Sequence, residues 1–152
     1  MNENTPARVG LKEVEERVLS YLASMSLNIN ASNDGIYFFK YGSTVVTVSM
    51  FGVEDHTYVR IASTLLKDFD LCTDLMHTLF ELNNKVLFGA FLLFEDKTLS
   101  FSATLLGENL DLNEFAVTLR YVARTSDDYD DVLQELAGGK KAMDVLAEGG
   151  EL

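Results

Sequence analysis

Residues 79–139 constrain the fold of this chain more than any other part of it. Leu79–Leu82 have the pattern of a helix end, Asn83-Asn84 form a polar corner, and two apolar stretches meet at Glu95-Asp96-Lys97. A long acidic helix follows, and Gly138-Gly139 close it, as glycines commonly do in the left-handed conformation that ends a helix. The segment predicts ordered helices and a strand pair, yet it contains no motif typical of a reaction. We therefore interpret the chain as a protein-binding domain rather than an enzyme.

Apolar spacing predicts the remaining elements. From Leu11, apolar residues recur at steps of three and four, which indicates one buried helical face. Asp70 is the expected cap of a second helix, and the spacing Asp111-x-x-Glu114 is typical of a capping box that opens the third. Short β-branched stretches with polar turns between them predict antiparallel strands. The expected strands are 36–41, 44–51, 57–65, 86–95 and 98–106.

The expected fold is α+β, in the order helix–three strands–helix–two strands–helix, with a twisted, mainly antiparallel sheet flanked by helices. At 152 residues, the chain suits one domain. We expect a loose leader at residues 1–10, the single α+β domain at residues 11–139, and a tail at residues 140–152 with room for one short helix.

Two of the expected strands, 36–41 and 86–95, are apolar on both faces. In 86–95, Phe88, Leu92 and Phe94 lie on one side, while Leu87, Phe91 and Leu93 lie on the other. Either helices pack on both faces of the sheet, or surplus apolar surface meets another chain as a dimer seam or client groove. The residues we would test first as partner contacts, although any of them could belong to the core, are Val14, Val18, Phe39, Tyr41, Phe88 and Phe94.

Charge narrows the range of partners. Twenty-four acidic residues against 12 basic ones give a formal net charge of −12. Such a field repels nucleic acid and anionic membrane surfaces, so neither is an expected partner, whereas a basic peptide or protein would be attracted. A plainer explanation of the same charge is solubility.

Few side chains suggest catalysis or metal binding. His56 and His77 are the only histidines, and Cys72 is the only cysteine, with acidic neighbours that disfavour a reactive thiolate. The acidic run Asp127–Asp131 lacks the glycine and glutamate positions of an EF-hand, and we interpret it as a solvated helix face around an inward Tyr129. We expect no catalytic residues, no metal and no cofactor.

A cytoplasmic location is the default expectation. A single cysteine allows no intrachain disulfide, and the first residues lack the basic and apolar halves of a signal peptide. No apolar run approaches the ~20 residues that a membrane-spanning helix requires.

Several of these residues together resemble the YbjN-type branch of the type III secretion chaperone-like superfamily. The resemblance lies in Leu79–Asn84 leading into Phe88-Gly89-Ala90-Phe91, the hairpin through Asp96, Leu110–Phe115, and the run from Ser126 to Leu133 before Gly138-Gly139. It implies a small, acidic, non-enzymatic bacterial homodimer that holds an extended client segment against hydrophobic surface. The chain departs from the pattern in its tail beyond Gly139, and its first half matches only in the order of its elements.

Three functional hypotheses follow. The first is a homodimeric chaperone-like module that binds a protein or peptide, through pairing at a strand edge and pockets for side chains. The second is a structural or regulatory domain that self-associates and has no client. The third, a small-ligand binder or enzyme, is the least favoured.

Overall fold

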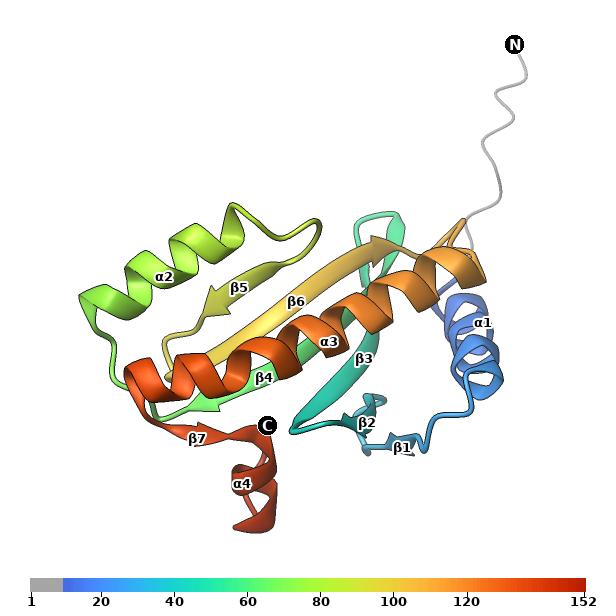
Figure 1. Ribbon diagram of the computed structural model, residues 1–152. Coiled ribbons are helices and arrows are strands. Elements are labelled where there is room, and N and C mark those ends of the chain that lie inside the picture. Colours follow the sequence, from blue (N-terminus) through green and yellow to red (C-terminus); the bar gives the residue numbers. More distant parts are fainter. Residues whose placement is uncertain (1–9) are drawn as a thin grey trace.

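A seven-stranded antiparallel sheet forms the centre of the computed structural model, which describes residues 10–152 (Figure 1). The strand order is β1-β2-β3-β4-β6-β5, and β7 pairs with β4 outside this path. The strands are β1 (Asn30–Ala31), β2 (Tyr37–Tyr41), β3 (Thr44–Val53), β4 (His56–Lys67), β5 (Ala90–Leu93), β6 (Thr98–Leu106) and β7 (Lys140–Lys141).

Four helices accompany the sheet: α1 (Leu11–Ser24), α2 (Thr73–Asn83), α3 (Leu112–Ala137) and α4 (Ala142–Ala147). The expected α+β order is confirmed, with β1 and β7 added to it, and α4 lies in the tail at residues 140–152 that had room for one short helix. The capping box is also present, because Asp111 accepts from the Glu114 N–H at 2.8 Å while the Glu114 carboxylate accepts from the Asp111 N–H. The leader expected at residues 1–10 falls almost wholly outside the described residues.

The long helix α3 covers one face of the sheet and makes the core. Figure 1 shows it lying lengthwise over β4 and β6, with α1 at one end and α2 beside β5. Phe101 from β6 and Phe115 from α3 are fully buried within this layer, and each large apolar side chain buried there contributes about 1.5–3 kcal/mol. The strands add Val46, Val48, Val59, Ile61 and Leu99, and α3 adds Leu119, Val122 and Leu133.

The opposite face of the sheet is built differently. The cross-strand row Thr47, Ala62 and Ser102 consists of small or hydroxyl side chains, all partly exposed. A sheet with one wet face needs no second helical layer, so the central part of this face is compatible with water. The segment that contains α4 packs against β3 and β4 and lies against the start of β3 on this face.

Three expectations about local structure were wrong. Cys72, not Asp70, caps α2: its sulfur accepts from the Leu75 N–H at 3.4 Å. The strand expected at 86–95 is reduced to β5, because the chain leaves the sheet at Gly89, whose φ is +83°. A Cβ at Gly89 would lie 2.8 Å from the Ser102 carbonyl oxygen, so the chain can pass there only as glycine.

The third wrong expectation is that the acidic run of α3 forms a solvated helix face. Asp130 is only 1% exposed, and Asp127 is partly buried. The Asp127 carboxylate accepts from the Ser43 N–H at 2.8 Å, and the Ser43 hydroxyl lies 2.6 Å from Asp130 Oδ2. Asp127 and Asp130 therefore hold the β2–β3 turn onto α3 rather than facing water, while Tyr129 does pack inward, against Phe91.

Candidate functional site

Nearly half of the exposed large apolar side chains lie along one stretch of chain. Of the 17 that the described residues expose, eight lie between residues 71 and 94. Phe80 is 69% exposed and Leu87 is 79% exposed. We call this set the α2–β5 surface, and it comprises Leu71, Met76, Phe80, Leu87, Phe88, Leu92, Leu93 and Phe94. Leu92 pairs with Ser100, so it lies on the opposite face of β5 from Phe91 and Leu93, which pair with the core residues Phe101 and Leu99.

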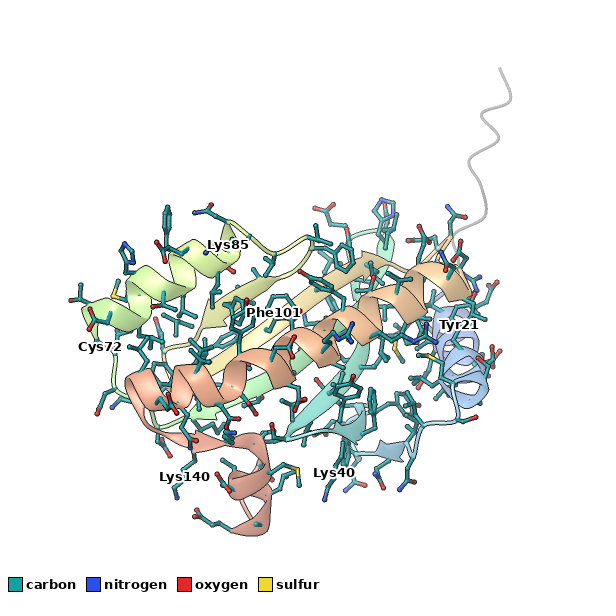
Figure 2. The ribbon with its side chains drawn as sticks, in the orientation of Figure 1. Tyr21, Lys40, Cys72, Lys85, Phe101 and Lys140 are labelled. Carbon is teal, nitrogen blue, oxygen red and sulfur yellow. The ribbon has the colours of Figure 1, made fainter. Side chains whose placement is uncertain are left out.

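Helix α2 has apolar residues on more than its buried face. Leu75, Leu79 and Leu82 point into the core, whereas Met76 and Phe80, one helical turn apart, point outward. Figure 2 labels Cys72 just before α2 and Lys85 just after it, and between them side chains of the helix project away from the sheet. A helix that is apolar beyond its core stripe is typical of one that meets a second partner.

Helix α3 supports the loop between α2 and β5. The Leu87 N–H donates to the Tyr121 hydroxyl at 2.8 Å, and the rings of Phe88 and Tyr121 lie 4.4 Å apart between centroids. Phe91 turns inward, 4.8 Å from the ring of Phe101. The loop is thus held in place from beneath while Leu87 and part of Phe88 stay exposed, which makes the surface preformed.

The outer edge of β5 is partly closed by α2. The Phe91 N–H donates to Asn83 Oδ1 at 2.7 Å, and Asn83 Nδ2 donates to the Phe91 carbonyl at 3.1 Å. An unpaired strand edge is a template for another strand, and a side-chain amide with both bonds made removes one such position. Strand addition at Phe91 would require Asn83 to leave, so the α2–β5 surface offers apolar side chains more readily than backbone groups.

The six residues that the sequence singled out are placed in different environments. Val14 and Val18 of α1 and Phe39 of β2 are buried in the core, so they are closed to a partner in this structure. Phe88 and Phe94 are exposed within the α2–β5 surface. Tyr41 is also exposed, but it lies on β2, which β3, β4 and β6 separate from β5, and it is not brought together with them.

Sequence reasoning did not list six members of the surface: Leu71, Met76, Phe80, Leu87, Leu92 and Leu93. Met76 and Phe80 widen the apolar stripe that Leu75, Leu79 and Leu82 form along this helix. The width of that stripe was the available signal, because one side of an 11-residue helix cannot bury all of it.

The described residues contain no group of three or more His, Cys, Asp or Glu side chains arranged to hold a metal. His56 pairs with Glu108 at 3.1 Å, and His77 lies 3.9 Å from Glu81 on the surface of α2. The pKa of Glu108 is lowered, chiefly because its carboxylate accepts from the Thr57 N–H, with a smaller contribution from His56. The His56–Glu108 contact links the start of β4 to the loop before α3, whereas His77 and Glu81 are exposed within α2, next to Met76 and Phe80 in the sequence.

Among residues 10–152, no helix combines the length and apolar content that crossing a bilayer requires.

Comparisons with known proteins identify a matching family and a solved structure with a similar fold. Residues 12–145 match the family described as T3SS (YopN, CesT) and YbjN peptide-binding chaperone 1. A chain in the crystal structure of the ExsC–ExsE complex has a similar fold, with a TM-score of 0.61 at 14% identity, over 81% of this chain and 95% of that one. No match was found among curated proteins.

The fold is that of the type III secretion chaperone-like class, an antiparallel sheet flanked by helices. Since the family model spans most of its length, the chain belongs to the T3SS and YbjN peptide-binding chaperone family. The resemblance noted in the sequence is thereby confirmed.

Proposed function

We propose that this protein is a non-enzymatic, chaperone-like module that acts as a homodimer and binds a protein or peptide client. The α2–β5 surface is the seam between the two copies. Family membership supports the peptide-binding role, and the proposed location is the cytoplasm of a bacterium. Nucleic acid and membrane lipid are not proposed as partners, because the net charge of −12 repels both.

The observation that carries the proposal is the set of exposed apolar side chains along α2 and the loop that leads to β5, a loop that α3 supports from beneath. Leaving several of them in water forgoes about 1.5–3 kcal/mol for each one that a partner would bury. Phe80 is the best anchor, because it is aromatic, widely exposed and central to α2. Interface energy usually concentrates in a few such residues.

The test is the substitution Phe80→Asp. We expect light scattering coupled to gel filtration to show a dimer for the wild type and a dissociation constant at least ~10-fold higher for the variant, as for an interface hot spot. Because Phe80 is exposed in the single copy, its unfolding free energy should change by less than about 0.5 kcal/mol.

Val53→Asp is the matched control. Val53 is 49% exposed but lies at the end of β3, outside the α2–β5 surface, so this variant should stay dimeric. A wild-type protein that remains monomeric at every concentration would contradict the seam. A dimer that binds no member of a peptide array and recovers no client from host extract would instead favour the self-associating domain without a client.

A further inference from the structure

The segment after α3 adds the short strand β7 to the end of β4, beyond the part of β4 that pairs with β3. β3 pairs with β4 only as far as Ser63, and β4 continues to Lys67. The free edge beyond Ser63 is taken by β7, with Leu66 opposite Lys141 and Lys67 opposite Lys140. Two residues of the chain's own tail are thus added as a strand to an edge that the preceding hairpin leaves open.

The rest of the tail covers a hollow on the opposite side of the sheet from α3. Val45 points away from the core cluster to which Val46 and Val48 belong, yet it is fully buried. It lies with Ile36, Phe38 and Thr47 against Leu146 and residues 150–152, around a hollow of about 310 Å³. The hollow between the tail and the strands is partly open to solvent.

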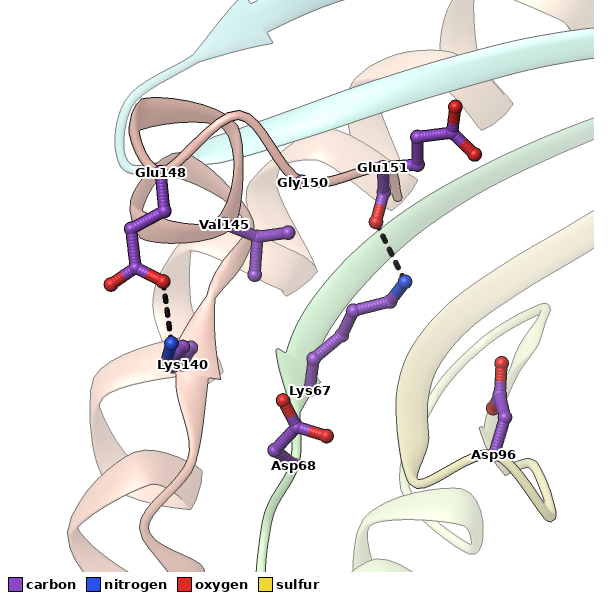
Figure 3. Close-up of a pocket in the computed structure, with 8 residues that line it drawn as sticks. All are labelled: Lys67, Asp68, Asp96, Lys140, Val145, Glu148, Gly150 and Glu151. Atoms are coloured by element: carbon purple, nitrogen blue, oxygen red, sulfur yellow. Dashed lines mark hydrogen bonds and ion pairs between the residues drawn. The ribbon is translucent and has the colours of Figure 1, made fainter.

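The tail is held by contacts at a few points. Figure 3 shows Lys67 reaching from β4 to the Glu151 carbonyl oxygen, at 2.7 Å, and Lys140 paired with Glu148. Within α4 only Ala142 and Val145 are buried, and a six-residue helix is not stable by itself. Surface ion pairs add little, so this segment belongs to the low-stability part of the molecule.

The buried carboxylate of Asp130 indicates what chemistry a segment needs in order to occupy the β7 position beside β4. Asp130 Oδ1 is buried and has no hydrogen-bond partner among the described residues, and Lys141 Nζ lies 3.5 Å from it. Lys141 also pairs with Asp131. A buried carboxylate without a cation is costly, so whatever occupies this edge must bring a positive charge to the place that Lys141 fills.

We propose that residues 140–152 are an intramolecular strap on a second peptide-binding surface, formed by the free end of β4 and the hollow over Val45. A partner segment displaces the strap when it has the same chemistry: a short extended stretch with a basic residue facing Asp130, followed by aliphatic side chains. What displaces the strap in the cell rests on the proposed client-binding function. The strap itself does not depend on the α2–β5 seam.

Gly139 is the hinge of the strap, and its backbone conformation leaves no room for a side chain. Gly139 has a φ of +84°, and a Cβ there would lie 2.6 Å from the Lys67 carbonyl oxygen. Replacing it disturbs the entry into β7 without touching the hollow. This provides a second route to release the strap, independent of the side chains of α4.

The experiment uses the full-length chain and a fluorescein-labelled synthetic peptide with the sequence of residues 140–152. In Val145→Asp the strap is weakened, and fluorescence anisotropy should show the peptide bound at least ~10-fold more tightly than by the wild type. Ala147→Asp is the control, since Ala147 is exposed on the same helix and gains the same charge, and its affinity should equal that of the wild type. Gly139→Ala should behave like Val145→Asp.

A peptide that carries glutamate in place of both lysines should not bind Val145→Asp. Equal affinities of the wild type and the released variants would overturn the proposal, as would failure of both folded variants to bind. If both variants lose the fold, judged by circular dichroism, the segment is an integral part of the core, and the strap is contradicted as well. If Phe80→Asp stays dimeric, the proposed seam is contradicted, but the peptide result is unaffected. The two proposals therefore fail separately.

Discussion

Asp127 supplies hydrogen bonds that the β2–β3 turn cannot make within itself. Its carboxylate accepts from the N–H and from the hydroxyl of Ser43, at 2.8 and 3.0 Å. Gly42 precedes Ser43 with a φ of +53°, and any Cβ there would collide with the Asp127 carboxylate. One residue on α3 therefore fixes both the conformation of the turn and the identity of its glycine.

Asp127→Ala should lower the free energy of unfolding by about 1–3 kcal/mol, because the Ser43 amide loses its charged acceptor. Urea denaturation measures the change. Asp128→Ala is the matched control, since Asp128 is exposed on the next position of the helix, and it should change stability by less than about 0.5 kcal/mol. Equal effects of the two substitutions would show that the turn does not depend on Asp127.

Glu108 links the start of β4 to the loop before α3, and its lowered pKa makes this link sensitive to pH. Because the folded state favours the carboxylate, the contribution to stability is present above the usual pKa of a glutamate and is lost as pH falls through the lower, folded value. Glu108→Gln should therefore be less stable than the wild type at neutral pH, with a difference that shrinks towards about pH 3.5.

Urea midpoints at the two pH values measure that difference, with Glu135→Gln as the control because Glu135 is exposed on α3. A stability gap between the wild type and Glu108→Gln that is constant with pH would show that the carboxylate contributes no pH dependence.

At the scale of elements, α2 and β5 act as one unit. The helix covers part of the core through its leucines, closes the strand edge through Asn83, and exposes Met76 and Phe80. Edge strands that lack such closure tend to pair with other chains. The contact of α2 with the edge of β5 therefore lets the protein expose apolar side chains while it prevents strands of other chains from pairing with that edge.

Asn83→Ala should open this edge. Two hydrogen bonds to Phe91 are lost, so we expect stability to fall by about 1–3 kcal/mol and concentration-dependent association to appear beyond the dimer. Analytical ultracentrifugation detects the larger species, and Asn84→Ala, an exposed neighbour, serves as the control. A variant that keeps the wild-type distribution of species would indicate that the edge is closed by other means.

Most elements could be predicted from sequence because their apolar spacing is local. The capping box at Asp111 and the alternation of Leu99, Phe101 and Ala103 fixed α3 and β6 without reference to the rest of the chain. The end of β5 at Gly89 could not be predicted, since it depends on the distant Ser102 carbonyl. The two-residue strand β7 likewise exists only because β4 offers it a partner.

The candidate site was predictable in part for the same reason. Phe88 and Phe94 emerged because a strand apolar on both faces cannot bury both in a single layer. Phe80 did not, because deciding which side of α2 is buried requires knowing that α3 occupies only one face of the sheet. Val14, Val18 and Phe39 belong to the buried core, and the apolar spacing of α1 already indicated a buried face for the two valines.

At the scale of the whole molecule, the proposed seam and the strap use different parts of the sheet. β5 is the terminal strand on one side, whereas β7 and α4 lie against β3 and β4, with β6 between them and β5. Two copies joined along α2 and β5 would therefore leave both straps accessible. Because each copy carries a net charge of −12, added salt should favour their association.

The late position of β7 in the chain has a consequence for biosynthesis. Residues 140–152 are translated after every residue they cover, so a growing polypeptide that has already assembled β2, β3 and β4 still has Val45 uncovered. During that interval the vacant edge of β4 can receive a segment from another molecule before the protein's own tail arrives, so a partner made nearby at the same time would meet no competitor.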